Sequence, residues 1–152
     1  MGLQVLRVKG SKLAKKVANK QFKLLCADYN KVYKIIDTLK EMLDSGNYTK
    51  GTIDEIPTAF DAINVVYSHA NMLSVDIENT IEELTERLRA AEEYKKEHEI
   101  YLITIIRLEY MTNLVIYLRE MKIEVDKIAD EIGTIIDRIS NIEEFEELNF
   151  YE

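Results

Sequence analysis

Residues 18–43 read ANKQFKLLCADYNKVYKIIDTLKEML, and this stretch decides the fold. Its apolar residues recur at alternating steps of four and three, the spacing that keeps one stripe of an α-helix against a partner helix. The stripe consists of Ala18, Phe22, Leu25, Tyr29, Val32, Ile36, Leu39 and Leu43. Leu24, Ile35 and Met42 lie beside it and widen it, so we expect this helix to contact more than one neighbour.

Residues that favour helix ends flank this stripe. Ser11 follows a glycine and carries the hydroxyl that an N-cap uses. Gly46 and Asn47 can each take the left-handed conformation that ends a helix. The sequence therefore predicts a first helix over residues 11–45.

Two further stripes follow with the same spacing. Thr52–Glu55 matches a capping box, so we predict that a second helix begins there, with Pro57 in its first two turns. The second stripe consists of Ile56, Phe60, Ile63, Tyr67, Ala70, Ser74, Ile77, Ile81, Leu84, Leu88 and Ala91. The third stripe consists of Leu118, Met121, Val125, Ile128, Ile132, Ile135, Ile139 and Ile142. Gly133 interrupts the last helix and weakens it by about 1 kcal/mol relative to alanine.

The connection between the second and third stripes is ambiguous, because residues 92–99 contain no Gly, Pro, Asn or Ser to signal a turn. A turn there gives helices near residues 11–45, 58–96 and 99–141. A continuous helix over residues 58–141 would be too long for the first helix to cover. We predict an all-α protein of three long helices with heptad, coiled-coil-like packing. The two arrangements are an up-down-up bundle, which we favour, and an extended helical hairpin completed by oligomerisation.

The chain length of 152 residues fits one ordinary domain. We predict an N-terminal arm over residues 1–10, a single helical domain over residues 11–141, and an acidic C-terminal tail over residues 142–152. The tail combines carboxylates with spaced aromatic residues, a composition typical of frayed ends and of short docking segments.

Cysteine usage and hydropathy bear on the compartment. Cys26 is the single cysteine, which excludes an internal disulfide framework and fits a reducing compartment. No signal peptide is recognisable. The most apolar stretch, residues 100–118, contains Arg107, Glu109 and Asn113, which are costly in a bilayer. We therefore expect a cytoplasmic protein without a transmembrane segment.

Charge is sorted along the chain. The first 40 residues hold ten basic and two acidic residues, a net charge of +8, whereas the whole chain carries −8. The remainder therefore carries −16. We predict a partner-binding basic arm formed by Lys9, Lys12, Lys15, Lys16, Lys20 and Lys23.

Several polyanions could bind this arm. We rank an acidic protein surface first, such as the face around residues 78–99 of a neighbouring subunit, then nucleic acid, then an anionic membrane surface. Aromatic residues are not interleaved with the lysines, so base stacking is not indicated. In charge layout alone, the basic first helix and acidic later helices resemble membrane-remodelling filament proteins of the ESCRT-III type. That resemblance keeps a peripheral membrane-surface filament as an alternative.

The stretch 100–118 is apolar on nearly every side of a helix, and such a helix is normally buried on every side. Three helices of one chain have difficulty covering it. We therefore predict a homo-oligomer or a larger protein assembly. The predicted oligomer interface consists of Ile100, Ile103, Ile106, Tyr110, Leu114 and Tyr117.

Motifs for catalysis are lacking. The residues three before His69 and His98 are not glutamates, so the helical di-metal carboxylate motif does not occur. No zinc-binding motif, phosphate-binding glycine loop or nucleophile elbow occurs either. We expect neither catalytic residues nor a metal, a cofactor or a small-molecule substrate. The sequence favours a non-catalytic structural or assembly protein, with a nucleic-acid-associated protein as the main alternative.

Overall fold

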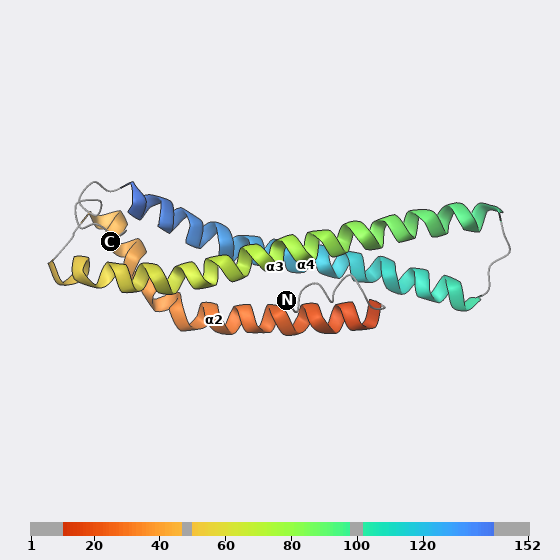
Figure 1. Cartoon of the computed structure of the whole chain (residues 1–152), viewed down its shortest axis with the longest axis horizontal. Coiled ribbons are helices and arrows are strands. Elements are labelled where there is room, and N and C mark those ends of the chain that lie inside the picture. Colours follow the sequence, from red (N-terminus) through yellow and green to blue (C-terminus); the bar gives the residue numbers. More distant parts are fainter. Residues whose placement is uncertain (1–10, 47–49, 98–101, 142–152) are drawn as a thin grey trace. The chain divides into compact units, whose positions relative to one another are not determined.

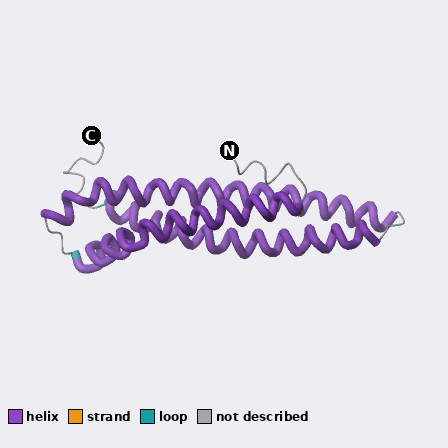
Figure 2. Tube along the Cα trace, turned by 90° about the horizontal axis from the view of Figure 1, so that it is seen from below, coloured by secondary structure: helices purple, strands orange, loops and turns teal. Residues whose placement is uncertain are grey.

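The computed structural model describes residues 11–46, 50–97 and 102–141, and it describes side chains in residues 14–46, 56–94 and 108–141. Three helices form it: α2 (Ser11–Ser45), α3 (Lys50–Glu97) and α4 (Leu102–Ser140) (Figure 1). They pack against each other, and the described residues include no strand (Figure 2). The prediction of an all-α bundle of three long helices is confirmed.

The chain divides into two compact units, and each unit takes one segment from every helix. The first unit comprises Met1–Lys23 and Met72–Val125. The second unit comprises Leu24–Asn71 and Asp126–Glu152. Each unit is therefore a short three-helix bundle in its own right.

Contacts inside each unit show in which direction each helix runs. In the first unit, Lys122 Nζ lies 4.0 Å from Glu78 Oε2. One continuous helix would hold these residues about 66 Å apart at 1.5 Å per residue. The chain therefore reverses between α3 and α4, and the continuous helix over residues 58–141 is wrong. Antiparallel pairing lets the apolar stripes of α3 and α4 bury each other within one chain. Residues 98–101, between the two helices, lie outside the described part.

In the second unit, α2 and α4 run in the same direction. Lys40 of α2 contacts Glu131 of α4. Asp44, one turn further along α2, contacts Arg138, two turns further along α4. His69 of α3 contacts Asp28 near the start of that α2 segment, so α3 runs the opposite way. This is the up-down-up order that the sequence favoured.

The end of α2 agrees with the prediction. Gly46 has a φ of 67°, and its N–H donates to the carbonyl of Met42 over 3.0 Å. This is the left-handed helix cap.

The start of α3 differs from the prediction. It begins at Lys50, so the proposed capping box at Thr52–Glu55 lies within the helix. Pro57 also lies inside the helix. A proline near a helix start removes only one backbone hydrogen bond, which is why the helix can begin upstream of it.

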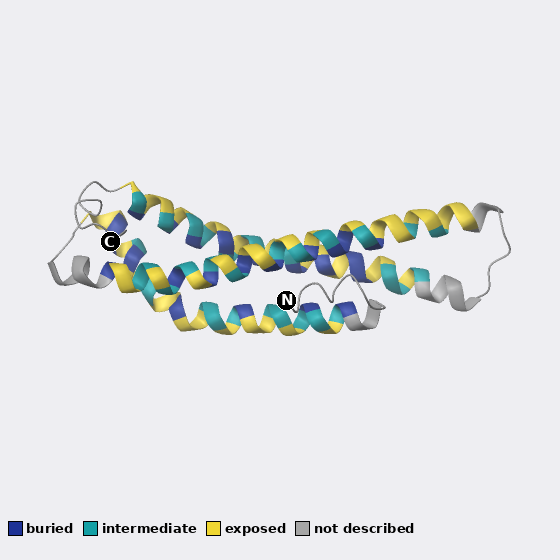
Figure 3. Cartoon of the chain, viewed as in Figure 1, coloured by how far each residue is buried: buried dark blue, intermediate teal, exposed yellow. Residues whose placement is uncertain are grey.

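The predicted stripes supply the core of each unit (Figure 3). In α2 the buried members are Ala18, Leu25, Val32, Ile36, Leu39 and Leu43. In α4 the buried members are Leu118, Met121, Val125, Ile132, Ile135 and Ile139. Met42 is also buried, but Leu24 is 47% exposed, so the widening that we predicted at Leu24 is wrong. Leu24 directly precedes the core residue Leu25 and is turned about 100° away from it around the helix.

Gly133 marks a close approach of α3 and α4 in the second unit. A Cβ atom at this position would lie 3.1 Å from Cε1 of Tyr67, which is closer than ordinary van der Waals contact. The half-buried Tyr67 ring therefore occupies the space that the missing side chain leaves.

Replacing Gly46 with alanine should destabilise the protein by about 1 kcal/mol, because an L-residue pays to hold a positive φ. No neighbouring atom lies within 4 Å of the added Cβ, so the cost is purely conformational. Gly46→Asn should cost less, because asparagine tolerates this conformation. Urea unfolding of the three proteins measures the difference, and equal stability of Gly46→Ala and wild type would contradict the assignment of this cap.

Adjacent leucines of α2 test the position of the core. Leu25 is 0% exposed, so Leu25→Ala should lower the free energy of unfolding by about 2–5 kcal/mol. Leu24→Ala removes the same atoms from a half-exposed position and should change the free energy by about 0.5 kcal/mol or less. Thermal and urea unfolding compare the two, and similar losses would show that the stripe is misplaced.

Candidate functional site

Three lysines form one exposed side of α2 in the first unit. Lys16, Lys20 and Lys23 are exposed and follow one another at steps of four and three. They lie on the opposite side of the helix from the buried Ala18. None of the three makes an ion pair with a described residue. We call these three residues the lysine face.

The other predicted members of the basic arm do not belong to this face. Lys15 Nζ lies 5.0 Å from the ring centroid of Tyr117 on α4. Such a cation–π contact contributes about 0.5–1 kcal/mol at an exposed site. Tyr117 O–H also donates to Asn19 Oδ1, so the two contacts join α2 to α4. Lys9 lies outside the described residues, and the structure does not describe the side chain of Lys12.

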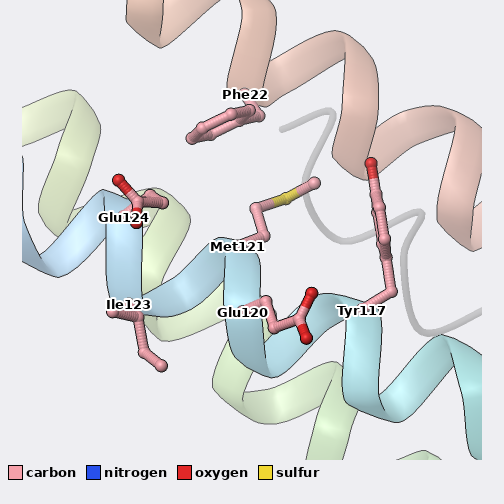
Figure 4. Close-up of a pocket in the computed structure, with 6 residues that line it drawn as sticks. All are labelled: Phe22, Tyr117, Glu120, Met121, Ile123 and Glu124. Atoms are coloured by element: carbon pink, nitrogen blue, oxygen red, sulfur yellow. The ribbon is translucent and has the colours of Figure 1, made fainter.

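A pocket of about 450 Å³ opens beside these contacts in the first unit. Phe22 of α2 lines it together with five residues of α4, namely Tyr117, Glu120, Met121, Ile123 and Glu124 (Figure 4). Figure 4 shows Met121 between Phe22 and α4, with Glu120 and Glu124 on either side of it. The pocket thus combines an apolar surface with two carboxylates four residues apart. Helical spacing of Glu120 and Glu124 was visible in the sequence, but the contribution of Phe22 from another helix was not.

The predicted oligomer interface is partly described. Tyr110 is half-buried, Leu114 is 3% exposed and Tyr117 is 36% exposed. Leu114 is therefore already covered by its own chain, whereas the neighbouring Ile116 is 49% exposed. Ile103 and Ile106 lie within α4, but their side chains are not described, and Ile100 lies outside the described residues.

The paired ends of α3 and α4 lack a core in the first unit. No described side chain in residues 85–94 or 108–113 is buried. Figures 1 and 2 show that α2 begins short of these ends, so that of the described helices α3 and α4 alone pair there. Two helices cannot enclose an apolar side chain as three can, which explains the absence of buried residues.

A polar cluster joins α2 to α4 in the second unit. Lys40 Nζ donates to Glu131 Oε2 over 2.8 Å, and Tyr29 O–H donates to Glu131 Oε1. Burial alone would raise the pKa of Glu131, but the hydrogen bonds from Lys40 and Tyr29 and the charge of Lys40 outweigh it and lower the pKa. Burial, followed by the bond to Glu131, raises the pKa of Tyr29 to about 12. A carboxylate held ionised in this way is a weak base, so the cluster suits a link between helices better than proton transfer.

The described residues contain no group of three or more His, Cys, Asp or Glu that could hold a metal ion. Within the same part of the chain, no helix combines the length and the apolarity that crossing a membrane requires. Cys26 is half-buried.

Comparisons with known proteins give no relative: no family model, no curated protein and no solved structure matches the chain.

Tyr29→Phe should destabilise the protein by about 1 kcal/mol at pH 7, because a hydrogen bond to an ionised carboxylate is lost. The pKa of Tyr29 is raised on folding, so this contribution is present below pH 10 and declines as the pH rises toward about 12. The pKa of Glu131 is lowered, so the contribution also declines as the pH falls below the ordinary value of 4.5. Urea unfolding of wild type and variant across this range measures the difference.

Tyr33→Phe is the matched control, because Tyr33 is 43% exposed and lies on the same helix. It should change stability little at any of these pH values. A pH-independent loss in Tyr29→Phe would contradict the assigned coupling between Tyr29 and Glu131.

Proposed function

We propose that the chain is a non-catalytic assembly protein that acts through helix-mediated self-association and charge-complementary contacts. The observation that carries this proposal is the unburied pairing of α3 and α4 near residues 85–94 and 108–113. Residues 102–111 read LITIIRLEYM, an apolar stretch whose described members, residues 108–111, are half-buried or exposed. Apolar residues that their own chain leaves incompletely buried commonly mark a protein interface.

The predicted interface follows the heptad spacing of the sequence. Ile103, Ile106, Tyr110 and Leu114 recur at steps of three and four, and of these Tyr110 is half-buried and Leu114 is buried in the structure. A second copy that pairs its own α3 and α4 there would complete a four-helix arrangement. As part of the same proposal we place the assembly in the cytoplasm, because the single cysteine fits a reducing compartment.

The lysine face supports a second candidate function, nucleic-acid association or, less directly, attachment to an anionic membrane surface. Lys16, Lys20 and Lys23 are exposed and have no described ion-pair partner, so they are available to phosphate groups. The net charge of −8 opposes this alternative, because it repels a nucleic-acid backbone at distances beyond the lysines themselves.

Light scattering across a micromolar concentration series tests self-association. Wild type should be oligomeric, and Ile103→Asp combined with Ile106→Asp should shift it to monomer by placing charges in the apolar interface. Val75→Asp is the control, since Val75 is 58% exposed on α3 within the first unit and should leave the oligomer intact. Circular dichroism verifies that all variants remain helical. A wild-type protein that stays monomeric would contradict the proposal, and retention of nucleic acid in a gel shift would favour the second candidate.

A further inference from the structure

The pocket between α2 and α4 fits a segment of the same chain: we propose that the N-terminal arm, residues 1–10, folds back along α2 and docks into it. In this contact Val5 lies over Phe22 and Met121, and Arg7 pairs with Glu120. The docked arm covers apolar surface that otherwise faces water and adds a further link between α2 and α4. The contact lies within one chain and stands apart from the proposed self-association.

The pocket combines an apolar lining with an exposed carboxylate. Its apolar lining residues are Phe22 of α2 and Tyr117, Met121 and Ile123 of α4 (Figure 4). Ile123 is 56% exposed, so the described residues leave part of this lining uncovered. Glu120 is exposed and makes no ion pair with a described residue. A fitting occupant therefore brings apolar side chains together with a positive charge.

The N-terminal arm has the matching composition. Residues 1–10 read MGLQVLRVKG, so they combine apolar side chains with Arg7 and Lys9 and contain no acidic residue. Val5 and Arg7 are two positions apart, so in an extended segment they point to the same side. The C-terminal tail, residues 142–152, contains five glutamates, and Glu120 would repel it.

The arm can reach the pocket from its attachment to α2. This helix begins at Ser11, and Phe22 follows eleven residues later, about 17 Å along the axis at 1.5 Å per residue. An extended chain that folds back covers this distance in about five residues at about 3.3 Å each. Val5 lies six residues before Ser11, which leaves one residue for the turn. Gly10 permits the sharp change of direction there.

Charge alone does not select Glu120, because Glu82 and Glu92 of α3 are also exposed without a described ion pair. Their neighbours on the helix surface, three and four positions away, distinguish these carboxylates. Around Glu120 these positions hold mainly apolar or aromatic residues, namely Ile116, Tyr117, Ile123 and Glu124. Around Glu82 they hold only polar residues, namely Glu78, Asn79, Thr85 and Glu86. Around Glu92 they include three basic residues that would repel Arg7, namely Arg89, Lys95 and Lys96. Of the three carboxylates, Glu120 is therefore the one that lies beside apolar surface.

Photo-crosslinking of the full chain tests where the arm lies. Val5→p-benzoylphenylalanine places a photoreactive group on the arm without changing its charge. After irradiation, mass spectrometry should find adducts mainly on Met121, Phe22 and the other residues that line the pocket. Circular dichroism verifies that the substituted protein remains helical.

Charge reversal in the same protein tests the ion pair. Glu120→Lys should lower the yield of pocket adducts by a factor of about 1.5–5, which is the contribution of one exposed ion pair. Arg7→Glu should have the same effect, and combining the two changes should restore the yield, because the reversed charges attract each other again. Glu82→Lys is the matched control and should leave the yield unchanged, since Glu82 is equally exposed but lies on α3.

A mixture of isotope-labelled and unlabelled protein shows which copy the arm contacts. Pocket adducts within single copies, lowered by either reversal and restored by both together, support the inference. Adducts that join a labelled to an unlabelled copy show that the arm occupies the pocket of a second copy and overturn docking within one chain. Adducts mainly on α3 or on residues 108–113, or a yield that Glu120→Lys leaves unchanged, overturn it as well. Light scattering on the same samples decides self-association separately, so each proposal can fail without the other.

Discussion

The fold depends on one requirement, which is that each helix must hide a single apolar stripe from water. The stripes of α2, α3 and α4 recur at steps of three and four, so the members of each stripe share one side of their helix, and most of the described members are buried. No helix can satisfy this requirement alone. The reversal of the chain between α3 and α4 satisfies it within each unit, where antiparallel neighbours bury one another and α2 closes the third side.

Polar contacts in the second unit select which side of α4 faces α2, which the apolar stripes alone do not specify. An apolar stripe specifies that helices pair but discriminates poorly among partners of similar composition. Glu131 accepts hydrogen bonds from two residues of α2, Tyr29 and Lys40, while Arg138 and Asp44 pair across the same helices. These part-buried or exposed contacts contribute modestly to stability, and their main consequence is to match α2 with one side of α4.

Periodicity was sufficient to predict the helices and most of the core from the sequence. The buried Leu25, Ile77 and Ile132 are all stripe residues, and Gly46 ends α2 as its conformational freedom indicated. The chain reversal was not predictable with equal ease, because residues 92–99 carry no turn signal and the reversal is decided by tertiary packing. The start of α3 was misplaced because a capping box is a local pattern that a longer helix can absorb.

The candidate site was harder to predict than the fold. The lysines of α2 were recognisable by charge and spacing, but the contact of Lys15 with Tyr117 joins residues about 100 positions apart and leaves no trace in local sequence. The same is true of the pocket, since Phe22 belongs to the α2 stripe and reaches the pocket only through the pairing of two helices. Periodic patterns describe one helix at a time, whereas a site assembled from several helices depends on their relative rotation.

The close approach of Tyr67 to Gly133 restricts how α3 can shift along α4. Ile128, Ile132, Ile135 and Ile139 make the α4 stripe almost uniform, so moving α3 along it by one turn would still match apolar residues. The ring of Tyr67 fits where position 133 has no side chain, and one turn away in either direction it would meet Ala129 or Asp137 instead. Such a slip would therefore produce a steric clash or place a carboxylate against the ring. The missing side chain at Gly133 therefore favours one alignment of α3 with α4 over alignments that are shifted by one turn.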